Sequence, residues 1–210
     1  ESQVTRHDYG GLWTREKLKA LENYSNFFTT ALKNIGFKLH YADAFAGTGE
    51  QHLKLQDGQD LLFPEEDFEG SVKVALNLKQ PFHKYHFNEL NPKHVARLEQ
   101  LKAEHPDIDI SITQKEANEF TREFCSSLGR QDRALLFLDP YSTQLNWETL
   151  VHVAKTQRTD LWLLFPISAL LRMTPKNESQ IRPEWDEALT RLLGLSGCND
   201  VIYQPKTASG

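Results

Sequence analysis

The 210-residue chain contains 39% hydrophobic and 25% charged residues, the composition of an ordinary soluble globular protein. Its net charge of −5 argues against a protein that coats nucleic acid, although a local basic cleft is compatible with it. No apolar run approaches the roughly 20 residues that span a membrane, and no signal peptide opens the chain. The two cysteines, Cys125 and Cys198, have no C-x-x-C neighbours. We therefore expect a cytoplasmic protein with neither a disulfide framework nor a zinc site.

The hydrophobic pattern predicts a regular alternation of helices and strands. Helices are expected where apolar residues recur at three- and four-residue spacing, and strands where apolar residues alternate or run continuously. In chain order, the predicted elements are a helix over 12–36, a strand over 37–45, a helix over 70–78, a strand over 83–90, a helix over 91–106, a strand over 108–114, a helix over 116–129, a strand over 133–140, a helix over 146–156, a strand over 159–167 and a helix over 182–194.

Capping residues mark several helix ends. Thr14 is a candidate N-cap of the first helix, and Gly36 is a natural stop for it. Ser71 is a candidate N-cap of the second helix. Asn91 followed by Pro92 is a stronger start signal, because asparagine caps well and proline suits the first helical turn.

The order of these elements predicts an α/β fold. The strands at 135–139 and 161–167 are apolar without a polar face, which indicates a mostly parallel, Rossmann-like sheet with helices on both faces. The polar, acidic segment 50–69 is long for a connection inside a compact domain, so it is either functional or mobile. No repeat, low-complexity segment or linker divides the chain, and we predict one domain over residues 1–210.

The segment YADAFAGTGEQ ends the first predicted strand and carries Asp43, Phe45, Gly47 and Gly49. Ligands of such sheets bind beyond the carboxyl ends of the strands, where the strand order reverses. The two glycines either make a tight strand–loop turn or let the backbone approach a ligand closely. The acid that precedes them favours the second interpretation.

The chemistry of this segment favours a positively charged cofactor without phosphate. A P-loop requires lysine and serine or threonine after its last glycine, but Glu50 follows Gly49. A nicotinamide fingerprint requires a third glycine where His52 stands. Asp43 would repel a diphosphate but attract the ammonium and sulfonium groups of S-adenosylmethionine (SAM). We therefore expect SAM to bind here.

Polar residues also end the other predicted strands. Glu89 ends the second strand, where a carboxylate can accept both ribose hydroxyls. Glu116 or Asn118 follows the third strand and could meet the adenine amine. Asp139 and Tyr141 follow the fourth strand, where an acid can hydrogen-bond an amine and a ring can stack on a flat base. The alternatives are solvated loop acids and, for Asp139, a turn that starts the next helix.

These segments, in order, resemble the three-Cys-motif partner (TcmP) family of the class I SAM-dependent methyltransferase-like group. The resemblance spans nearly all of residues 12–195 and rests on WTREKLKALENY, YADAFAGTG, EGSVKVAL, HFNELNP, EANEF, FLDPYSTQLNWETL and DLWLLFP with Arg172. It implies a class I methyltransferase sheet that binds SAM, and a partner protein that carries a three-cysteine motif. It also implies the methionine end of SAM at Asp43, Gly47 and Gly49, the ribose at Glu89 and the adenine at Glu116.

Two departures from related patterns matter. Adenine-N6 methyltransferases carry D-P-P followed by tyrosine or phenylalanine, whereas this chain has Asp139, Pro140 and Tyr141. The methylated atom therefore stays open. Family members also continue with a further strand pair, so we expect a sheet truncated after the fifth strand and a chain that is part of a longer protein.

Weaker signals come from histidines and cations. His83 and His86 lie three apart on a strand and point to opposite faces, so we expect no metal site. Arg172, Lys176 and Arg182 are either a solvated loop or phosphate contacts for a nucleic-acid substrate.

The sequence thus favours a SAM-dependent methyltransferase that acts on nucleic acid, with Asp139 and Tyr141 as catalytic residues. One alternative is a non-catalytic binding module that keeps the fold and works with a protein partner. Another is a nicotinamide-dependent enzyme, which His52 and Asp43 disfavour.

Overall fold

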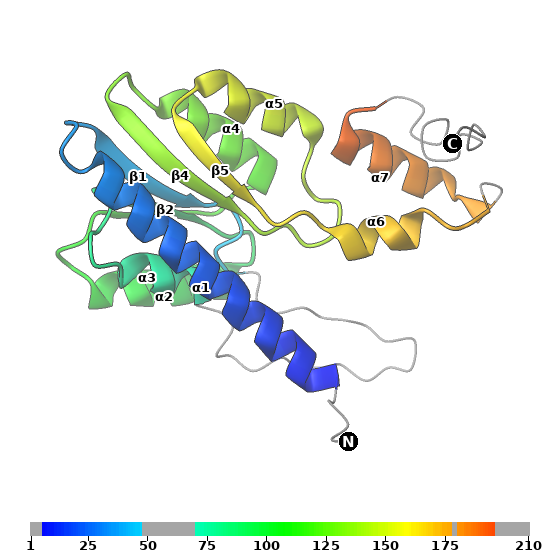
Figure 1. The fold of residues 1–210 in the computed structure, drawn as a ribbon, viewed down its shortest axis with the longest axis horizontal. Helices are drawn as coiled ribbons and strands as arrows, with labels where there is room; N and C mark the ends of the chain where they lie inside the picture. Colours follow the sequence, from blue (N-terminus) through cyan, green and yellow to red (C-terminus); the bar gives the residue numbers. More distant parts are fainter. Residues whose placement is uncertain (1–5, 48–69, 178–179, 196–210) are drawn as a thin grey trace, which may run out of the picture.

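The structure is a computed structural model that describes residues 6–47, 70–177 and 180–195, with side chains from residue 15 onward. Helices and strands alternate along the chain (Figure 1). They are α1 (Arg6–Leu32), β1 (Lys38–Asp43), α2 (Gly70–Leu76), β2 (Lys84–Asn88), α3 (Pro92–Glu104), β3 (Ile110–Thr113), α4 (Ala117–Ser127), β4 (Asp132–Leu138), α5 (Trp147–Thr156), β5 (Thr159–Leu163), α6 (Ile167–Met173) and α7 (Pro183–Leu193).

The five strands form one parallel sheet in the order β3-β2-β1-β4-β5. The chain builds outward from β1 to β3, then returns to place β4 on the other side of β1. The strand order therefore reverses between β1 and β4, which makes the carboxyl ends of these two strands the expected ligand crevice. The predicted α/β, Rossmann-like fold is confirmed.

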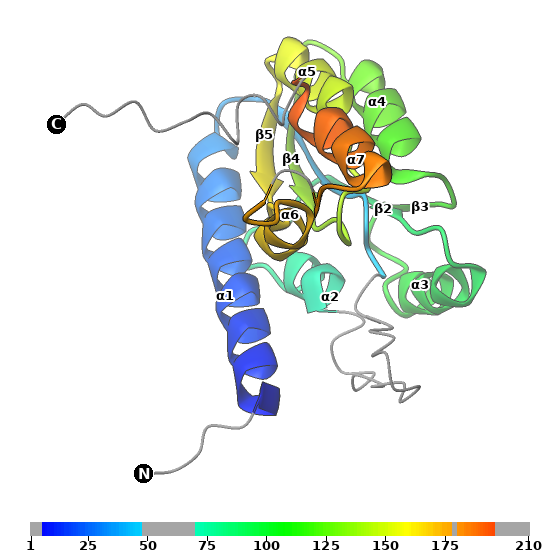
Figure 2. The ribbon, with the colours of Figure 1, turned by 90° about the vertical axis from the view of Figure 1, so that its right-hand side faces the viewer.

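Helices cover both faces of the sheet (Figures 1 and 2). Side chains alternate between the two faces along each strand, so Tyr41 and Phe137 join one core while Ala42 and Leu136 join the other. The first core includes residues of α1, α2 and α3, and the second includes residues of α4, α5 and α7. Among the described residues, no helix combines the length and apolar character that crossing a bilayer requires.

Some predicted boundaries hold and others are wrong. Asn91 caps α3 as predicted, since its side chain accepts a hydrogen bond from the Lys93 N–H at 3.0 Å. Thr14 is not an N-cap, because α1 already begins at Arg6. Ser71 is also not a cap, because it lies inside α2 and its hydroxyl bonds elsewhere.

The fifth predicted strand differs most from the structure. The pattern at 161–167 predicts a buried strand, but β5 ends at Leu163 and α6, which was not predicted, begins at Ile167. Within the part of the chain that the structure describes, β5 pairs only with β4. Leu161 and Phe165 are exposed, and no other strand of the described residues lies at this edge.

Two histidines, His40, which is buried, and His86, which is half-buried, meet on the α4 side of the sheet. His40 Nδ1 lies 3.1 Å from His86 Nε2, and His40 Nε2 lies 3.2 Å from Asp132 Oδ1. The His86 ring packs against Phe124 with ring centroids 4.9 Å apart. Burial, with smaller contributions from His40 and Lys84, lowers the pKa of His86 to about 4.

This lowered pKa predicts acid sensitivity. Below pH ~6.5 the unfolded chain binds a proton at His86 that the folded chain does not bind, so the contribution of His86 to stability falls as the pH drops from ~6.5 to ~4, by about 3 kcal/mol in total. The variant His86→Gln does not titrate and should lose less stability over this range. Urea unfolding at several pH values measures the difference. His105→Gln, at the end of α3, is the matched control and should keep the wild-type slope; equal slopes for all three proteins would contradict the prediction.

Candidate functional site

A cavity of about 500 Å³ lies at the carboxyl ends of β1, β2 and β3. We call it the carboxyl-end pocket. It is lined by Ala44, Phe45, Asn88, Glu89, Leu90, Asn91, Lys115, Glu116, Ala117 and Gln144. Three residues predicted from sequence to bind the cofactor, Phe45, Glu89 and Glu116, therefore lie in one pocket. Parallel strands bring them together because all their carboxyl ends meet at the same edge of the sheet.

Asp43 is a buried residue that stabilises the backbone at this edge of the sheet. It is fully buried, and its Oδ1 accepts a hydrogen bond from the Phe45 N–H at 3.0 Å while its Oδ2 accepts one from the Ser71 hydroxyl at 2.7 Å. Burial raises the pKa of Asp43 to about 7, although these two hydrogen bonds oppose the shift. Asp43 therefore holds the turn after β1 and is not part of the pocket lining.

Glu89 joins that turn to the next strand end. Its Oε2 accepts a hydrogen bond from the Gly47 N–H at 3.0 Å, and its Oε1 accepts one from the Asn91 N–H at 2.7 Å. Only 4% of Glu89 is exposed. The Gly47 N–H thus contacts a buried carboxylate of the protein itself, and close approach of this backbone to a ligand stays a prediction. Gly49 lies outside the described residues.

Glu116 and Asn118 build the other wall. Glu116 caps α4 by accepting a hydrogen bond from the Glu119 N–H at 3.0 Å. Asn118 donates to Glu116 Oε1 at 2.7 Å and to the Gln144 carbonyl at 2.8 Å, and its Oδ1 accepts from the Asn146 N–H at 2.8 Å. Asn118 therefore braces α4 against the loop after β4, while Glu116 faces the pocket.

Sequence reasoning did not single out Asn88, which ties three strand ends together. Its amide donates to the Ala44 carbonyl at 3.1 Å and to the Lys115 carbonyl at 3.0 Å, and it accepts from the Lys115 N–H at 3.1 Å. Its own carbonyl accepts from the Ala46 N–H at 3.0 Å. The sequence offered one sign of this role, because Asn88 is a polar residue at the end of a predicted strand, directly before Glu89.

Asp139 lies across the switch point from the pocket, at the end of β4. Its Oδ2 accepts a hydrogen bond from Lys17 Nζ of α1 at 2.8 Å, an ion pair that the sequence analysis missed. The charge of Asp139 also contributes to the raised pKa of Asp43, so the two acids are near neighbours. Tyr141 is exposed, and Ser142 beside it has a φ of 58°, a conformation that non-glycine residues rarely adopt.

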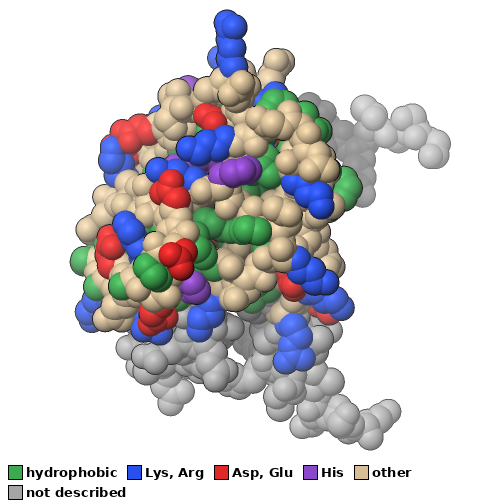
Figure 3. All heavy atoms as spheres, turned by 90° about the vertical axis from the view of Figure 1, so that its left-hand side faces the viewer, with side chains coloured by type: hydrophobic (Ala, Val, Ile, Leu, Met, Phe, Trp, Pro, Cys, Tyr) green, Lys and Arg blue, Asp and Glu red, His purple; other side chains and the backbone are tan. Residues whose placement is uncertain are grey.

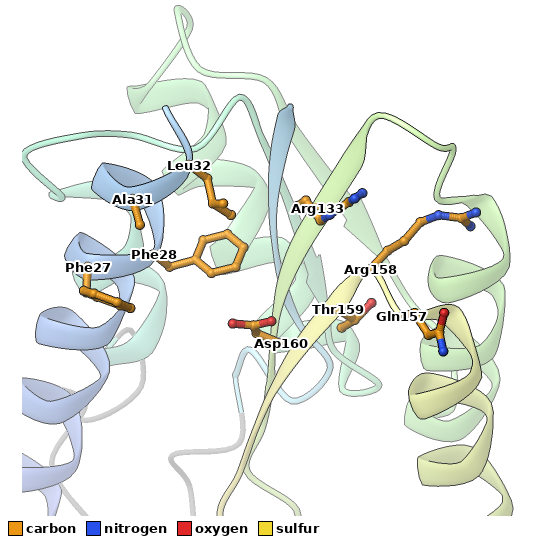
Figure 4. Close-up of a pocket in the computed structure, with 9 residues that line it drawn as sticks. All are labelled: Phe27, Phe28, Ala31, Leu32, Arg133, Gln157, Arg158, Thr159 and Asp160. Atoms are coloured by element: carbon orange, nitrogen blue, oxygen red, sulfur yellow. The ribbon is translucent and has the colours of Figure 1, made fainter. Parts of the chain in front are cut away.

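A second groove, of about 460 Å³, lies between the end of α1 and the amino ends of β4 and β5 (Figure 4). It is lined by Phe27, Phe28, Ala31, Leu32, Arg133, Gln157, Arg158, Thr159 and Asp160. None of the predicted site residues lines it. Since ligands of doubly wound sheets bind at the carboxyl ends of strands, we assign the functional site to the carboxyl-end pocket.

Neither a protein-family model nor a curated protein matches this sequence. Solved structures similar to this chain include LPL1258 of Legionella pneumophila, a DUF519 protein (15% identity, TM-score 0.40, 65% of this chain and 60% of that one). A conserved hypothetical protein of Streptococcus pyogenes is also similar, with 19% identity and a TM-score of 0.38 over 65% of this chain and 78% of that one. So is yhhF of Escherichia coli, provisionally assigned as a methyltransferase, with 13% identity and a TM-score of 0.37 over 66% of this chain and 62% of that one. The match thus spans less than two thirds of LPL1258 and of yhhF, and we infer function from the site alone.

The raised pKa of Asp43 predicts a second pH dependence, of opposite sign to that of His86. Between pH ~4 and ~7 the unfolded chain ionises this carboxyl while the folded chain retains the proton, so the contribution of Asp43 to stability falls as the pH rises, by about 4 kcal/mol in total. Asp43→Asn keeps the side-chain shape and should remove this loss, whereas Asp107→Asn in the exposed α3–β3 turn should not. Urea unfolding from pH ~4 to ~7 compares them. A wild-type slope in Asp43→Asn would show that Asp43 does not titrate in this range.

Proposed function

We propose that the protein is a SAM-dependent methyltransferase that acts on nucleic acid, and that SAM binds in the carboxyl-end pocket. The observation that carries the proposal is the lining of this pocket. Two carboxylates, Glu89 and Glu116, face it beside the apolar side chains of Phe45 and Leu90. Such a lining suits a nucleoside that carries positive charge and no phosphate.

The charges around the pocket support the same ligand. Lys115 is the one cation among its described lining residues, and its ammonium pairs with Glu123 at 2.6 Å and with Glu119 at 3.3 Å. A phosphate would therefore meet two carboxylates and a lysine that is already neutralised. A nucleoside diphosphate or a nicotinamide dinucleotide fits this surface less well than SAM does.

Each part of the lining of the carboxyl-end pocket has a role in this proposal. A carboxylate has about four lone-pair sites, and Glu89 uses two for backbone N–H groups, so it can also accept the ribose hydroxyls. Glu116 accepts the adenine amine, and Asn118 holds Glu116 in place. The turn that Asp43 holds, over residues 44–47, surrounds the methionine end, with Phe45 against the cofactor. When bound, SAM supplies a methyl group on a sulfonium.

Asp139 and Tyr141 hold the methyl acceptor. Lys17 occupies one oxygen of Asp139, which leaves Oδ1 to accept a hydrogen bond or proton from the acceptor. Tyr141 packs on the flat face of the methyl acceptor. This ion pair fixes the carboxylate relative to α1, and positioning of this kind is the main requirement of in-line transfer.

The family resemblance adds three further proposals: membership of the TcmP family, a partner protein with a three-cysteine motif, and a cytoplasmic location. The alternative function is a non-catalytic module of the same fold that works through a protein partner. The Lys17–Asp139 ion pair is the observation that favours this alternative, since it also gives Asp139 a structural role. Transfer of a labelled methyl group from SAM to mixed RNA or DNA separates the two functions, because only the enzyme transfers label.

The cofactor assignment predicts the effect of changing Glu89. Glu89→Ala removes the acceptor of the ribose hydroxyls and should weaken SAM binding about 10- to 100-fold, since hydrogen bonds to a charged group contribute roughly 1.5–3 kcal/mol. Titration calorimetry measures the affinity, and thermal unfolding verifies that the variant is folded. The control Glu104→Ala, exposed at the end of α3, should bind SAM normally. Unchanged affinity in folded Glu89→Ala would remove Glu89 from the site.

The catalytic assignment predicts a separation of binding from transfer. Asp139→Asn keeps the side-chain shape and removes its charge, so it should bind SAM normally and transfer methyl about 100-fold more slowly, the usual scale for a positioned acid or base. If Asp139 only orders the loop, asparagine replaces it adequately and transfer persists. Single-turnover transfer with saturating SAM distinguishes these outcomes.

A further inference from the structure

An exposed surface follows β5 on the far side of Asp139 from the carboxyl-end pocket. We call it the α6 surface, and it consists of Tyr141, Phe165, Ile167, Leu171 and Arg172. The exposed fractions of the four apolar residues, in this order, are 44%, 41%, 61% and 69%. Large apolar side chains grouped in this way on a protein surface usually mark a binding site.

The strand register places this surface beside the proposed reaction centre. Leu138 pairs with Leu163, and the Leu164 N–H donates to the Leu138 carbonyl at 2.9 Å. Two residues further along each chain, Phe165 therefore continues beside the segment of Asp139 and Tyr141. Because β4 lies between β1 and β5, Asp139 separates the carboxyl-end pocket from the α6 surface.

Helix α6 presents an outer face beyond the carboxyl ends of β4 and β5 (Figures 1 and 2). Ala169 is buried and Leu170 packs against the second core, so both point inward. Ile167 and Leu171 are four residues apart and share the opposite face of the helix, and Arg172 is exposed next to them.

The charge of this region differs from that of the whole chain. From Leu161 to Asn177 the sequence contains no acid and two cations, Arg172 and Lys176, although the chain carries a net charge of −5. The side of the molecule remote from α6 and α7 instead mixes Lys and Arg with Asp and Glu (Figure 3). A stretch that combines cations with exposed rings and lacks acids complements a phosphate backbone with accessible bases.

We propose that the α6 surface binds single-stranded nucleic acid, with unpaired bases stacked on Phe165 and Tyr141 and phosphates on Arg172 and Lys176. This inference rests on the proposed function, since it names the form of the substrate for the same site. Two cations are too few to hold a duplex mainly through its phosphates, and a duplex hides the base faces that the two rings could stack on. Stacking therefore supplies most of the affinity, and binding depends only weakly on salt.

Fluorescence anisotropy with labelled mixed-sequence RNA and DNA of about 12 nucleotides, each single-stranded and as a duplex, tests this inference without SAM. We expect wild-type protein to prefer the single strands. Phe165→Ala should weaken their binding about 10-fold, as loss of one stacking platform does. Arg172→Ala should reduce the slope of log K against log salt by about 0.7, the value for one phosphate contact on a single strand.

Matched controls lie at the opposite end of the sheet. Phe27→Ala removes an equally large, exposed ring from α1, and Arg130→Ala removes an exposed arginine before β4; both should bind oligonucleotides like wild type. Equal effects of test and control variants, preference for the duplex, or no oligonucleotide binding by the wild type would each overturn the inference. A change in oligomeric state of Phe165→Ala with unchanged oligonucleotide binding would instead identify an interface between copies, and would also overturn it.

The cofactor proposal is tested separately on the same proteins. Phe165→Ala should bind SAM with wild-type affinity by titration calorimetry, because Phe165 lies outside the carboxyl-end pocket. Loss of SAM binding in this variant would contradict the separation of the two surfaces. Oligonucleotide binding through the α6 surface in a wild-type protein that does not bind SAM would support the inference and refute the proposed function.

Discussion

The site depends on two buried carboxylates that hold the backbone turn after β1. Asp43 accepts the Phe45 N–H and Glu89 accepts the N–H groups of Gly47 and Asn91. A buried N–H group without a partner is costly, and a carboxylate is a stronger acceptor for it than a neutral group. Asp43 ends β1 and Glu89 follows β2, so the register of these neighbouring strands fixes the turn. The shape of the pocket floor thus follows from sheet pairing.

Much of this arrangement could be predicted from the sequence. Helical and strand periodicity gave the alternation of elements, and in a parallel sheet this alternation brings the strand ends to one edge. Glu89, Glu116 and Phe45 could be assigned to one site on that basis, because each lies at or just after the end of a predicted strand. The Asn91–Pro92 helix start is equally local, since a capping side chain bonds to a backbone group two residues away.

The remaining features involve contacts that leave no periodic pattern. Lys17 and Asp139 are 122 residues apart, and a lysine that pairs with a distant acid looks like any surface lysine on a helix. The apolar run of β5 by itself predicts a buried strand, whereas the truncation expected from the family resemblance predicts an open edge, and Leu161 is exposed there. Ser71 likewise looks like an N-cap from the sequence, because serine is common at that position. Only the packing of α2 beside β1 directs its hydroxyl to Asp43.

Charge is divided across the crevice in a way that follows from the strand order. On the side of β1, β2 and β3, Glu89 and Glu116 face the pocket, and a cation is favoured there. On the side of β5, acids are absent from Leu161 to Asn177, and Arg172 and Lys176 favour phosphates. Between them, Lys17 lies against Asp139 and also lowers the pKa of Asp43, which Asp139 raises. One lysine thus partly offsets two neighbouring carboxyl groups. A positively charged cofactor and a polyanionic acceptor would therefore be drawn to opposite sides of Asp139, and the reacting groups would meet beside the Lys17–Asp139 ion pair.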